Sequence, residues 1–411
     1  MKPFASLLQL SPNSHTALYI QIANQLIGLI RNGSFVANER LPSTRILANI
    51  LEVHRKTVVQ AYDELLAQGW LESRIGSGTF VARSMPINTL PQGNARDKNL
   101  GLRTAGFKLN SLAFEDRPIN IYSQKLHLDD GFPDPRLAPL SDLARAYRSQ
   151  LRTGNTYTKL GYADPCGTFW LREQLCEYLN ESRGLQVTPN NVLIVRGTIM
   201  GLHLAATGLI SPGDFVVTGE TSWMGATVNF TQAGAKAITV PVDQHGIDTY
   251  ALADICKKIK IRLLYITSHH HYPTTVALRA DRRLQLIQLA ELYGFIILED
   301  DYDYDFHYQS KPLLPLAATD PNGMVLYCGS FTKSVAPAFR IGYVVGPENV
   351  IRHLAAIRRI TDRQGDTILE NAFAELLQTG VIQRHLRKSL REYRNRRNLF
   401  CEMLKTELAG K

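Results

Sequence analysis

The chain has 411 residues, which predicts two or three domains, because single cores seldom grow beyond about 250–300 residues. Apolar residues make up 45 % and charged residues 20 %, as in soluble globular proteins, and no apolar run approaches the ~18 residues that a membrane span needs. The net charge of +9 favours acidic partners without identifying one. A membrane protein is therefore not expected.

Cysteine usage and the first residues bear on the cellular compartment. The 5 cysteines are spread along the chain without a C-x-x-C pair, which disfavours a disulfide framework and a thiolate zinc site. No basic and then apolar leader precedes Ser11. We therefore expect a cytoplasmic protein.

The N-terminal segment predicts three helices. Apolar residues recur at helical spacing between residues 18 and 30, and Asn32-Gly33 offers a left-handed cap. Ser43 is a suitable N-cap for a second helix that ends near Ile50, and a third helix is expected over residues 55–68. The order of these elements is helix, turn, helix.

The segment WLESRIGSGTFVA predicts two short strands joined around Gly76-Ser77-Gly78, which would form a β-hairpin wing. No helix follows this G-x-G sequence, so it is not a phosphate loop. Residues 1–83 are therefore expected to form a winged helix-turn-helix DNA-binding domain.

In such a domain the third helix enters the major groove of DNA, and the preceding helix contacts phosphates. The third helix buries an apolar stripe and exposes its first turns, so base contacts are expected from Arg55, Lys56, Thr57 and Gln60. Phosphate contacts are expected from Ser43, Arg45 and the wing backbone at Gly76. The pattern LPSTRxLA, then V-x-RKTV-x-x-AYDEL and a glycine-containing wing, resembles the GntR family of repressors over about residues 15–83.

Periodicity fails over residues 84–118, where proline, glycine and isolated charges predict a linker. From residue 119 to 411, helical patterns alternate with seven apolar runs: NVLIV, DFVVT, AITV, RLLYITS, GFIILED, MVLYC and IGYVV. This alternation predicts an α/β domain with a mostly parallel sheet. Ligands of such folds bind at the carboxyl ends of the strands.

Three polar motifs follow predicted strands. The N–H groups of Thr198 and Ile199 begin a helix and could bind phosphate, although a plain turn has the same pattern. Ser330 and Arg340 are two further phosphate donors near Lys333, whose amine could form a Schiff base or be simply solvated.

The third motif is the acidic end of GFIILEDDY. It could bind a divalent ion, or a single carboxylate at the strand tip could pair with a protonated pyridine nitrogen. The residues alone leave Asp300 and Asp301 as alternatives for that carboxylate.

Together these motifs resemble the large domain of fold-type I pyridoxal-phosphate enzymes, the aspartate aminotransferase superfamily. The resemblance implies pyridoxal 5'-phosphate as cofactor and Lys333 as the catalytic lysine that forms the internal aldimine. It further implies Asp300 at the ring nitrogen, favoured over Asp301 by the family's D-x-Y spacing to Tyr302, which would lie at the ring phenolate oxygen. Trp223 would stack on the ring, and the phosphate would be held by Thr198, Ile199, Ser330 and Arg340.

The family's NPTG or HQYPTG loop departs from its usual form in this chain. It is written HHHYPTT, with Thr275 in place of the usual glycine and no asparagine, so His270 or His271 is a possible substitute donor to the ring oxygen, and His271 is our candidate. A zinc site made by three adjacent histidines is not expected, because neighbours on an extended segment point to opposite faces.

A GntR-like domain joined to this second domain resembles the MocR/GabR-type regulators over essentially the whole chain. The resemblance implies a homodimer with the cofactor site near the subunit interface and a small amino-containing effector. It also leads us to expect an incomplete C-terminal small domain, since only 78 residues follow Lys333, and no arginine for an effector carboxylate can be assigned. The basic stretch at residues 384–397 predicts an amphipathic helix, either a solvated surface helix or a second DNA-contacting patch.

We therefore expect a transcriptional regulator that binds pyridoxal 5'-phosphate as an internal aldimine and responds to an amino-containing or B6-type effector. One alternative is a pyridoxal-phosphate-dependent aminotransferase with a regulatory DNA-binding module. Another is a regulator whose second domain is a cofactor-free dimerisation scaffold.

Overall fold

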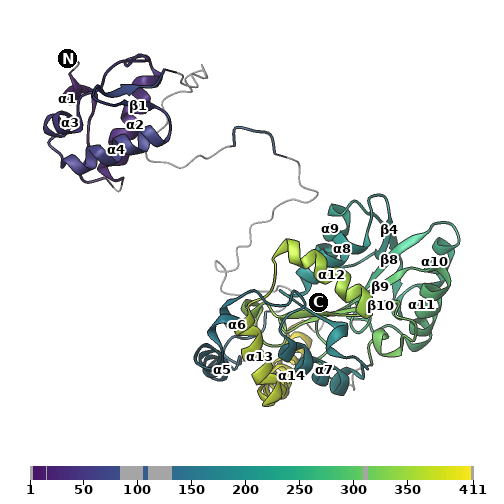
Figure 1. Ribbon diagram of the computed structural model, residues 1–411. Coiled ribbons are helices and arrows are strands. Elements are labelled where there is room, and N and C mark those ends of the chain that lie inside the picture. The colour runs from purple at the N-terminus through teal and green to yellow at the C-terminus, as the bar shows by residue number, and fades with distance from the viewer. Residues whose placement is uncertain (1–2, 15, 84–104, 110–131, 309–312, 409–411) are drawn as a thin grey trace. The chain divides into compact units, whose positions relative to one another are not determined.

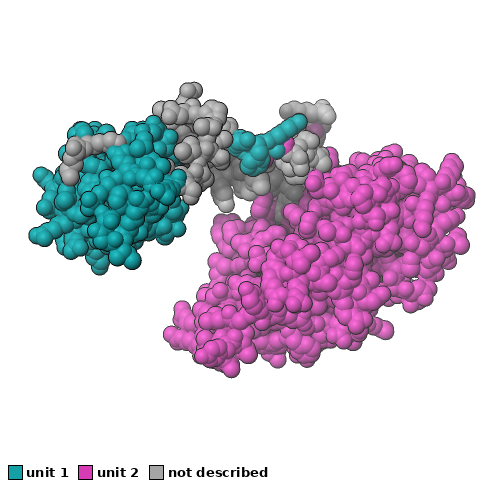
Figure 2. Space-filling view, turned by 45° about the horizontal axis from the view of Figure 1, so that its top comes forward, with its two compact units in different colours: residues 1–108 teal, residues 109–411 magenta. Residues whose placement is uncertain are grey.

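The computed structural model describes residues 3–14, 16–83, 105–109, 132–308 and 313–408. The chain divides into two compact units, residues 1–108 and 109–411 (Figure 2). The predicted linker, residues 84–118, spans this division and lies outside the described residues except for 105–109. Its exact limits stay a prediction.

The first unit is the winged helix-turn-helix that the sequence predicts. Its elements are α1 (Phe4–Leu7), α2 (Leu18–Arg31), α3 (Thr44–Ile50), α4 (Arg55–Ala67), β1 (Leu71–Arg74) and β2 (Gly78–Val81). The two strands pair antiparallel and form the wing. Only α1 was not expected, because four residues are too few to show a helical period.

Local signals set the helix limits in the first unit. The Ser43 hydroxyl accepts a hydrogen bond from the Ile46 N–H at 3.3 Å and caps α3. Gly33, with a φ of +79°, lies directly beyond α2. The α4 stripe that faces the core consists of Val58, Ala61, Tyr62 and Leu65. The opposite side of α4 is thereby left for solvent or a ligand.

The second unit is built on a seven-stranded sheet of order β3-β11-β10-β9-β8-β4-β5. Its strands are β3 (Val192–Val195), β4 (Phe215–Gly219), β5 (Lys236–Val240), β8 (Ile261–Ile266), β9 (Ile296–Asp301), β10 (Val325–Ser330) and β11 (Gly342–Val345). Neighbouring strands pair parallel except where β11 pairs with β3 and β10. The predicted seven-stranded, mostly parallel sheet is confirmed, and a separate hairpin is formed by β6 (Val242–Asp243) and β7 (Gly246–Ile247).

Helices cover both faces of this sheet (Figure 1). One face packs against α8 (Thr198–Leu209), α9 (Met224–Gln232) and α12 (Glu348–Thr361). The other packs against α5 (Leu140–Arg152), α7 (Phe169–Arg183), α10 (Thr249–Cys256), α11 (Ala280–Tyr293), α13 (Thr367–Gln378) and α14 (Val381–Glu407). The short α6 (Thr156–Leu160) has no buried residue. Because side chains alternate along a strand, Leu263 packs with α8 while Leu264 packs with α11.

The C-terminal basic stretch lies in the 27-residue helix α14, as predicted. Leu386 is buried while Arg387 and Lys388 are exposed. Arg396 forms an ion pair with Asp134 at 2.9 Å, so part of this charge serves the fold. Among the residues that the structure describes, no helix is long and apolar enough to cross a membrane.

Candidate functional site

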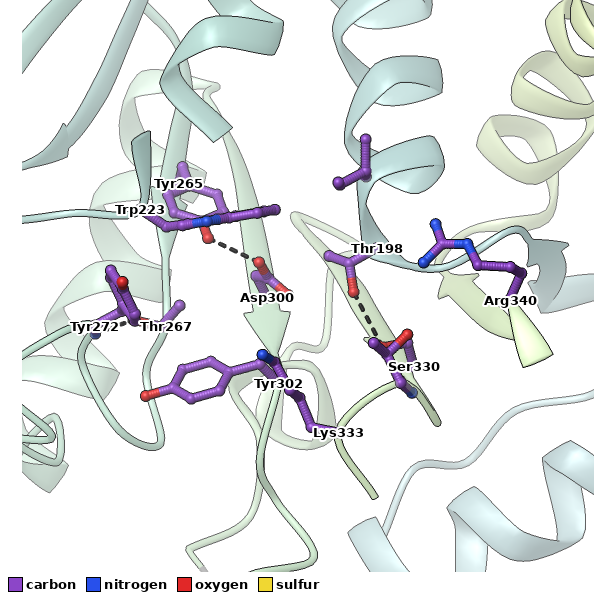
Figure 3. A pocket seen from close by; sticks show the side chains of 12 residues that line it. Thr198, Trp223, Tyr265, Thr267, Tyr272, Asp300, Tyr302, Ser330, Lys333 and Arg340 are labelled. Atoms are coloured by element: carbon purple, nitrogen blue, oxygen red, sulfur yellow. Dashed lines mark hydrogen bonds between the residues drawn. The ribbon is translucent and has the colours of Figure 1, made fainter. Parts of the chain in front are cut away.

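A pocket opens at the carboxyl edge of the large sheet (Figure 3). The edge collects the segments that follow β3, β4, β8, β9 and β10, as expected for parallel strands. The pocket is lined by Thr198, Ile199, Trp223, Tyr265, Thr267, Tyr272, Asp300, Tyr302, Ser330, Thr332, Lys333 and Arg340.

One corner of the pocket is suited to an anion. Helix α8 begins there without a side-chain cap, so its first N–H groups, those of Thr198 and Ile199, are directed outward at the positive end of the helix dipole. The Thr198 hydroxyl donates to the Ser330 hydroxyl at 3.3 Å, and Arg340 lies beside them (Figure 3). Three kinds of donor therefore meet at one point.

Gly197 makes room for the arginine at this corner. Its φ of +78° and ψ of 170° are accessible essentially only to glycine. A Cβ built on Gly197 would lie 2.8 Å from Arg340 Nη2. The Arg340 guanidinium also donates to the Arg196 carbonyl oxygen, which holds it across the start of α8.

Asp300 lies at the base of the pocket and is buried. The Tyr265 hydroxyl donates to its Oδ2 at 2.7 Å, while its Oδ1 is buried without a hydrogen-bond partner among the described residues. Burial raises the pKa of Asp300 to about 7. A buried carboxylate oxygen without a donor is suited to a cationic N–H group of a bound ligand.

Asp301 faces the opposite side of the sheet. Its carboxylate accepts hydrogen bonds from the Tyr327 hydroxyl and from the Tyr304 N–H, the latter at 3.0 Å. It does not line the pocket. Of the two neighbouring aspartates, only Asp300 is therefore available to a ligand there.

Lys333 and Trp223 lie on opposite sides of Asp300 in Figure 3. The Lys333 side chain is half-buried, and its Nζ lies 5.7 Å from the centre of the Phe132 ring. The Tyr302 hydroxyl donates to the His270 carbonyl oxygen at 3.0 Å. The pocket thus combines an amine, a carboxylate, an aromatic face and an anion corner.

His271 does not line this pocket, contrary to expectation. Its ring is buried, and Nε2 lies 2.7 Å from the Thr221 carbonyl oxygen. The side chain is directed towards the segment after β4, and Tyr272, the next residue, lines the pocket instead. The expected contact between His271 and a cofactor is therefore not supported.

Four lining residues were missed in the sequence: Tyr265, Thr267, Tyr272 and Thr332. Thr267 directly follows β8, so the rule that polar residues after parallel strands line a site could have found it. Tyr265 could not be found this way, because it lies within an apolar run whose two faces the sequence does not distinguish.

The predicted DNA-contacting residues lie at the surface of the first unit. Arg55, Lys56 and Gln60 are exposed on the first turns of α4, and Thr57 is half-buried there. Ser43 and Arg45 are exposed at the start of α3. Gly76 is exposed in the wing turn with a φ of +74°, and the space around it is open. His54, which the sequence did not single out, caps α4 through Nδ1, which accepts from the Lys56 N–H at 3.2 Å.

Comparison with known proteins assigns each unit to a family. Residues 18–81 match the bacterial regulatory proteins of the gntR family, and residues 127–410 match aminotransferase class I and II. The probable rhizopine catabolism regulatory protein MocR of Rhizobium meliloti is 31 % identical over 98 % of this chain and 80 % of its own. The HTH-type transcriptional regulator YisV of Bacillus subtilis is 32 % identical over 98 % of this chain and 83 % of its own.

Solved structures show the same fold for the second unit. The kynurenine aminotransferase of Pyrococcus horikoshii, crystallised in complex with PMP, matches with a TM-score of 0.63 and 27 % identity over 68 % of this chain and 70 % of its own. With a gntR-family DNA-binding domain followed by an aminotransferase class I and II domain, the chain belongs to the MocR-type family of HTH transcriptional regulators.

Proposed function

We propose that this regulator binds pyridoxal 5'-phosphate in the pocket around Lys333, and that the cofactor and an amino-containing effector control its binding to operator DNA. The observation that carries the proposal is the buried Asp300 Oδ1, which has no donor among the described residues and shares a pocket with Lys333. A pyridine ring protonated at nitrogen supplies the missing donor.

The chemistry of the remaining lining groups also fits the cofactor. Arg340, Ser330, Thr198 and the N–H groups at the start of α8 would hold the phosphate. Trp223 would pack against the ring, and the Tyr302 hydroxyl would donate to the ring oxygen in place of the His270 carbonyl oxygen that it now contacts. When bound, the cofactor supplies an aldehyde that condenses with amines. The residue for that reaction is Lys333.

Within this pocket each protein group has a defined task. Asp300, which is 4 % exposed, would hold the proton of the ring nitrogen through its Oδ1. An effector amine would compete with Lys333 Nζ for the same carbon atom. The competition can change DNA binding only if the two bound forms favour different arrangements of the chain.

Aminotransferase activity is a second candidate function. Lys333 and Asp300, the groups that would move a proton and stabilise charge on the ring, share the pocket. Turnover of an amino donor with a keto acid would favour aminotransferase activity. Binding of an amine without turnover would favour regulation alone.

A homodimer in the cytoplasm is part of the proposal. Tyr157, Leu160 and Tyr162 are 91 %, 71 % and 83 % exposed around α6, and a second copy of the chain would cover them. Light scattering of the purified chain tests the dimer. The cytoplasm is proposed because the gntR-family domain must reach DNA.

Borohydride reduction tests cofactor binding. The protein, incubated with pyridoxal 5'-phosphate, is reduced, digested and analysed by mass spectrometry, with Lys333→Ala as the test variant and Lys258→Ala, at an exposed lysine, as control. We expect one reduced adduct on the peptide that contains Lys333 in the wild type and in the control, and none at this site in Lys333→Ala. An unmodified Lys333 in folded wild-type protein would contradict the proposal.

A further inference from the structure

We propose that His269, His270 and His307 form a binding site for a divalent transition-metal ion, Zn²⁺ in the first place. The three rings come together beyond the carboxyl ends of β8 and β9, outside the pocket that contains Lys333. The proposal does not depend on the binding of pyridoxal 5'-phosphate.

The geometry is close to that of a three-histidine metal site. One ring nitrogen of each histidine lies within 4.8 Å of the others, and His269 Nε2 lies 3.0 Å from His307 Nδ1. Two zinc bonds of about 2.0–2.1 Å at a tetrahedral angle hold their nitrogens about 3.4 Å apart. A small opening of the His269 and His307 pair and a modest approach of His270 would therefore admit the ion.

The third ligand, His307, comes from outside the HHH segment. The chain bends at His269 and His270, so both of these neighbouring rings reach the cluster, whereas His271 is directed away, to the Thr221 carbonyl oxygen. His307 follows β9 and takes its place beside His269, with ring centres 4.4 Å apart. The cluster is formed by the fold rather than by adjacent residues.

Two ring nitrogens of the cluster, His269 Nε2 and His307 Nδ1, face each other at 3.0 Å. His269 Nε2 and His307 Nδ1 can share only one proton, whichever ring donates it. A metal ion accepts both lone pairs, and each ring then carries its proton on the outer nitrogen, His269 Nδ1 or His307 Nε2. His269 is only 9 % exposed, so little water competes for its facing nitrogen. Imidazole nitrogens that face each other in such a place are suited to a metal ion.

Asp303 orients the ring of His270 through a hydrogen bond. Its Oδ2 lies 2.7 Å from His270 Nδ1, so this nitrogen carries the proton and Nε2 keeps the lone pair for a metal. The other carboxylate oxygen, Oδ1, is buried without a partner among the described residues. Metal-binding histidines are commonly oriented by a carboxylate in this way.

The site would connect two loops of the second unit. His269 and His270 follow β8, whereas Asp303 and His307 follow β9. The Tyr302 hydroxyl, which lines the pocket, already donates to the His270 carbonyl oxygen at 3.0 Å. An ion bound by both loops would therefore fix one wall of the neighbouring pocket.

Metal binding is tested on the full chain, free of cofactor and of any affinity tag. Zn²⁺ affinity is measured by competition with a chromophoric chelator, and the visible spectrum of the Co²⁺ form reports coordination by nitrogen. We expect about one ion per chain and a tetrahedral Co²⁺ spectrum. His307→Gln should weaken binding at least ten-fold, and His203→Gln, at an exposed position of α8, should leave it unchanged.

Asp303→Asn keeps all three imidazoles and should weaken Zn²⁺ binding by roughly 10–100-fold. If circular dichroism shows that His307→Gln is unfolded, Asp303→Asn decides the question. Wild-type affinity no higher than that of folded His307→Gln, or a Co²⁺ spectrum that is octahedral in the wild type, would overturn the proposal.

Discussion

Asp300 and Asp301 are neighbours in β9 with different environments. Asp300 faces the pocket with one oxygen bound to Tyr265, and Asp301 faces the buried side chains of Tyr327 and Arg183. Burial raises the pKa of both carboxyls to about 7. A one-residue step along a strand thus separates a carboxylate that a ligand can reach from one that supports the fold.

The raised pKa of Asp300 gives the cofactor-free chain a defined pH dependence. The folded chain keeps this proton up to about pH 7, whereas the unfolded chain releases it near pH 4, so the stability contributed by Asp300 falls between these values. Asp300→Asn removes this contribution to the change of stability with pH. Relative to wild type, we expect the variant to gain stability on the order of 4 kcal/mol from pH 4 to pH 8, measured by urea unfolding. If the free energies of unfolding of wild type and Asp300→Asn changed in parallel with pH, this would contradict the raised pKa of Asp300.

Gly197 is expected to be essential for phosphate binding. In Gly197→Ala the new methyl group meets the Arg340 guanidinium, and the backbone is strained at a φ of +78°. We expect at least ten-fold weaker binding of pyridoxal 5'-phosphate, measured by absorbance titration. Gly213→Ala is the matched control, because it is also strained, at a φ of +93°, but has open space around it. Equal affinities of the two variants would remove the proposed role of this corner.

For single residues, the sequence predicts the position of a side chain only where a motif fixes the local geometry. The spacing of Ser330, Lys333 and Arg340 predicted that they meet, and all three line one pocket. The orientation of His271 depends on a hydrogen bond to Thr221, 50 positions away, which no local pattern indicates. The cluster of His269 and His307 was missed for the same reason, since its members follow different strands.

At the scale of elements, α4 presents its first turns to solvent and buries its apolar stripe. This orientation follows from the 3.6-residue period, which is why the helix and its exposed face were predictable. The seven strands were predictable because buried parallel strands are continuous apolar runs. Their order in the sheet was not, because pairing depends on contacts between distant segments.

Helix α4 gives a prediction for DNA binding. If Arg55 contacts a base, Arg55→Ala should weaken binding to the operator by about 1–3 kcal/mol and leave binding to unrelated DNA nearly unchanged. Arg45→Ala, at a proposed phosphate contact, should instead weaken both by similar factors. Fluorescence anisotropy with the two DNAs at one salt concentration measures the difference. An Arg55→Ala variant with wild-type affinity for the operator would remove the assignment.

At the scale of the whole molecule, a DNA-binding unit and an aminotransferase-like unit share one chain. Composition and motifs were sufficient to predict this division, because each unit has its own periodicity and its own signature. The linker could be predicted only as a loss of periodicity, and its exact limits stay open to experiment. Regulation requires that a ligand of the second unit change the affinity of the first for DNA.

The measurement that tests this coupling most directly is a footprint of the protein on the DNA that flanks its own gene. Wild type and Lys333→Ala are titrated with and without pyridoxal 5'-phosphate as the sole added ligand. We predict that the cofactor changes the concentration needed for half-protection, or the extent of the protected region, in the wild type and in neither respect in Lys333→Ala. The same footprint for all four samples, or the same response in the variant, would contradict the account.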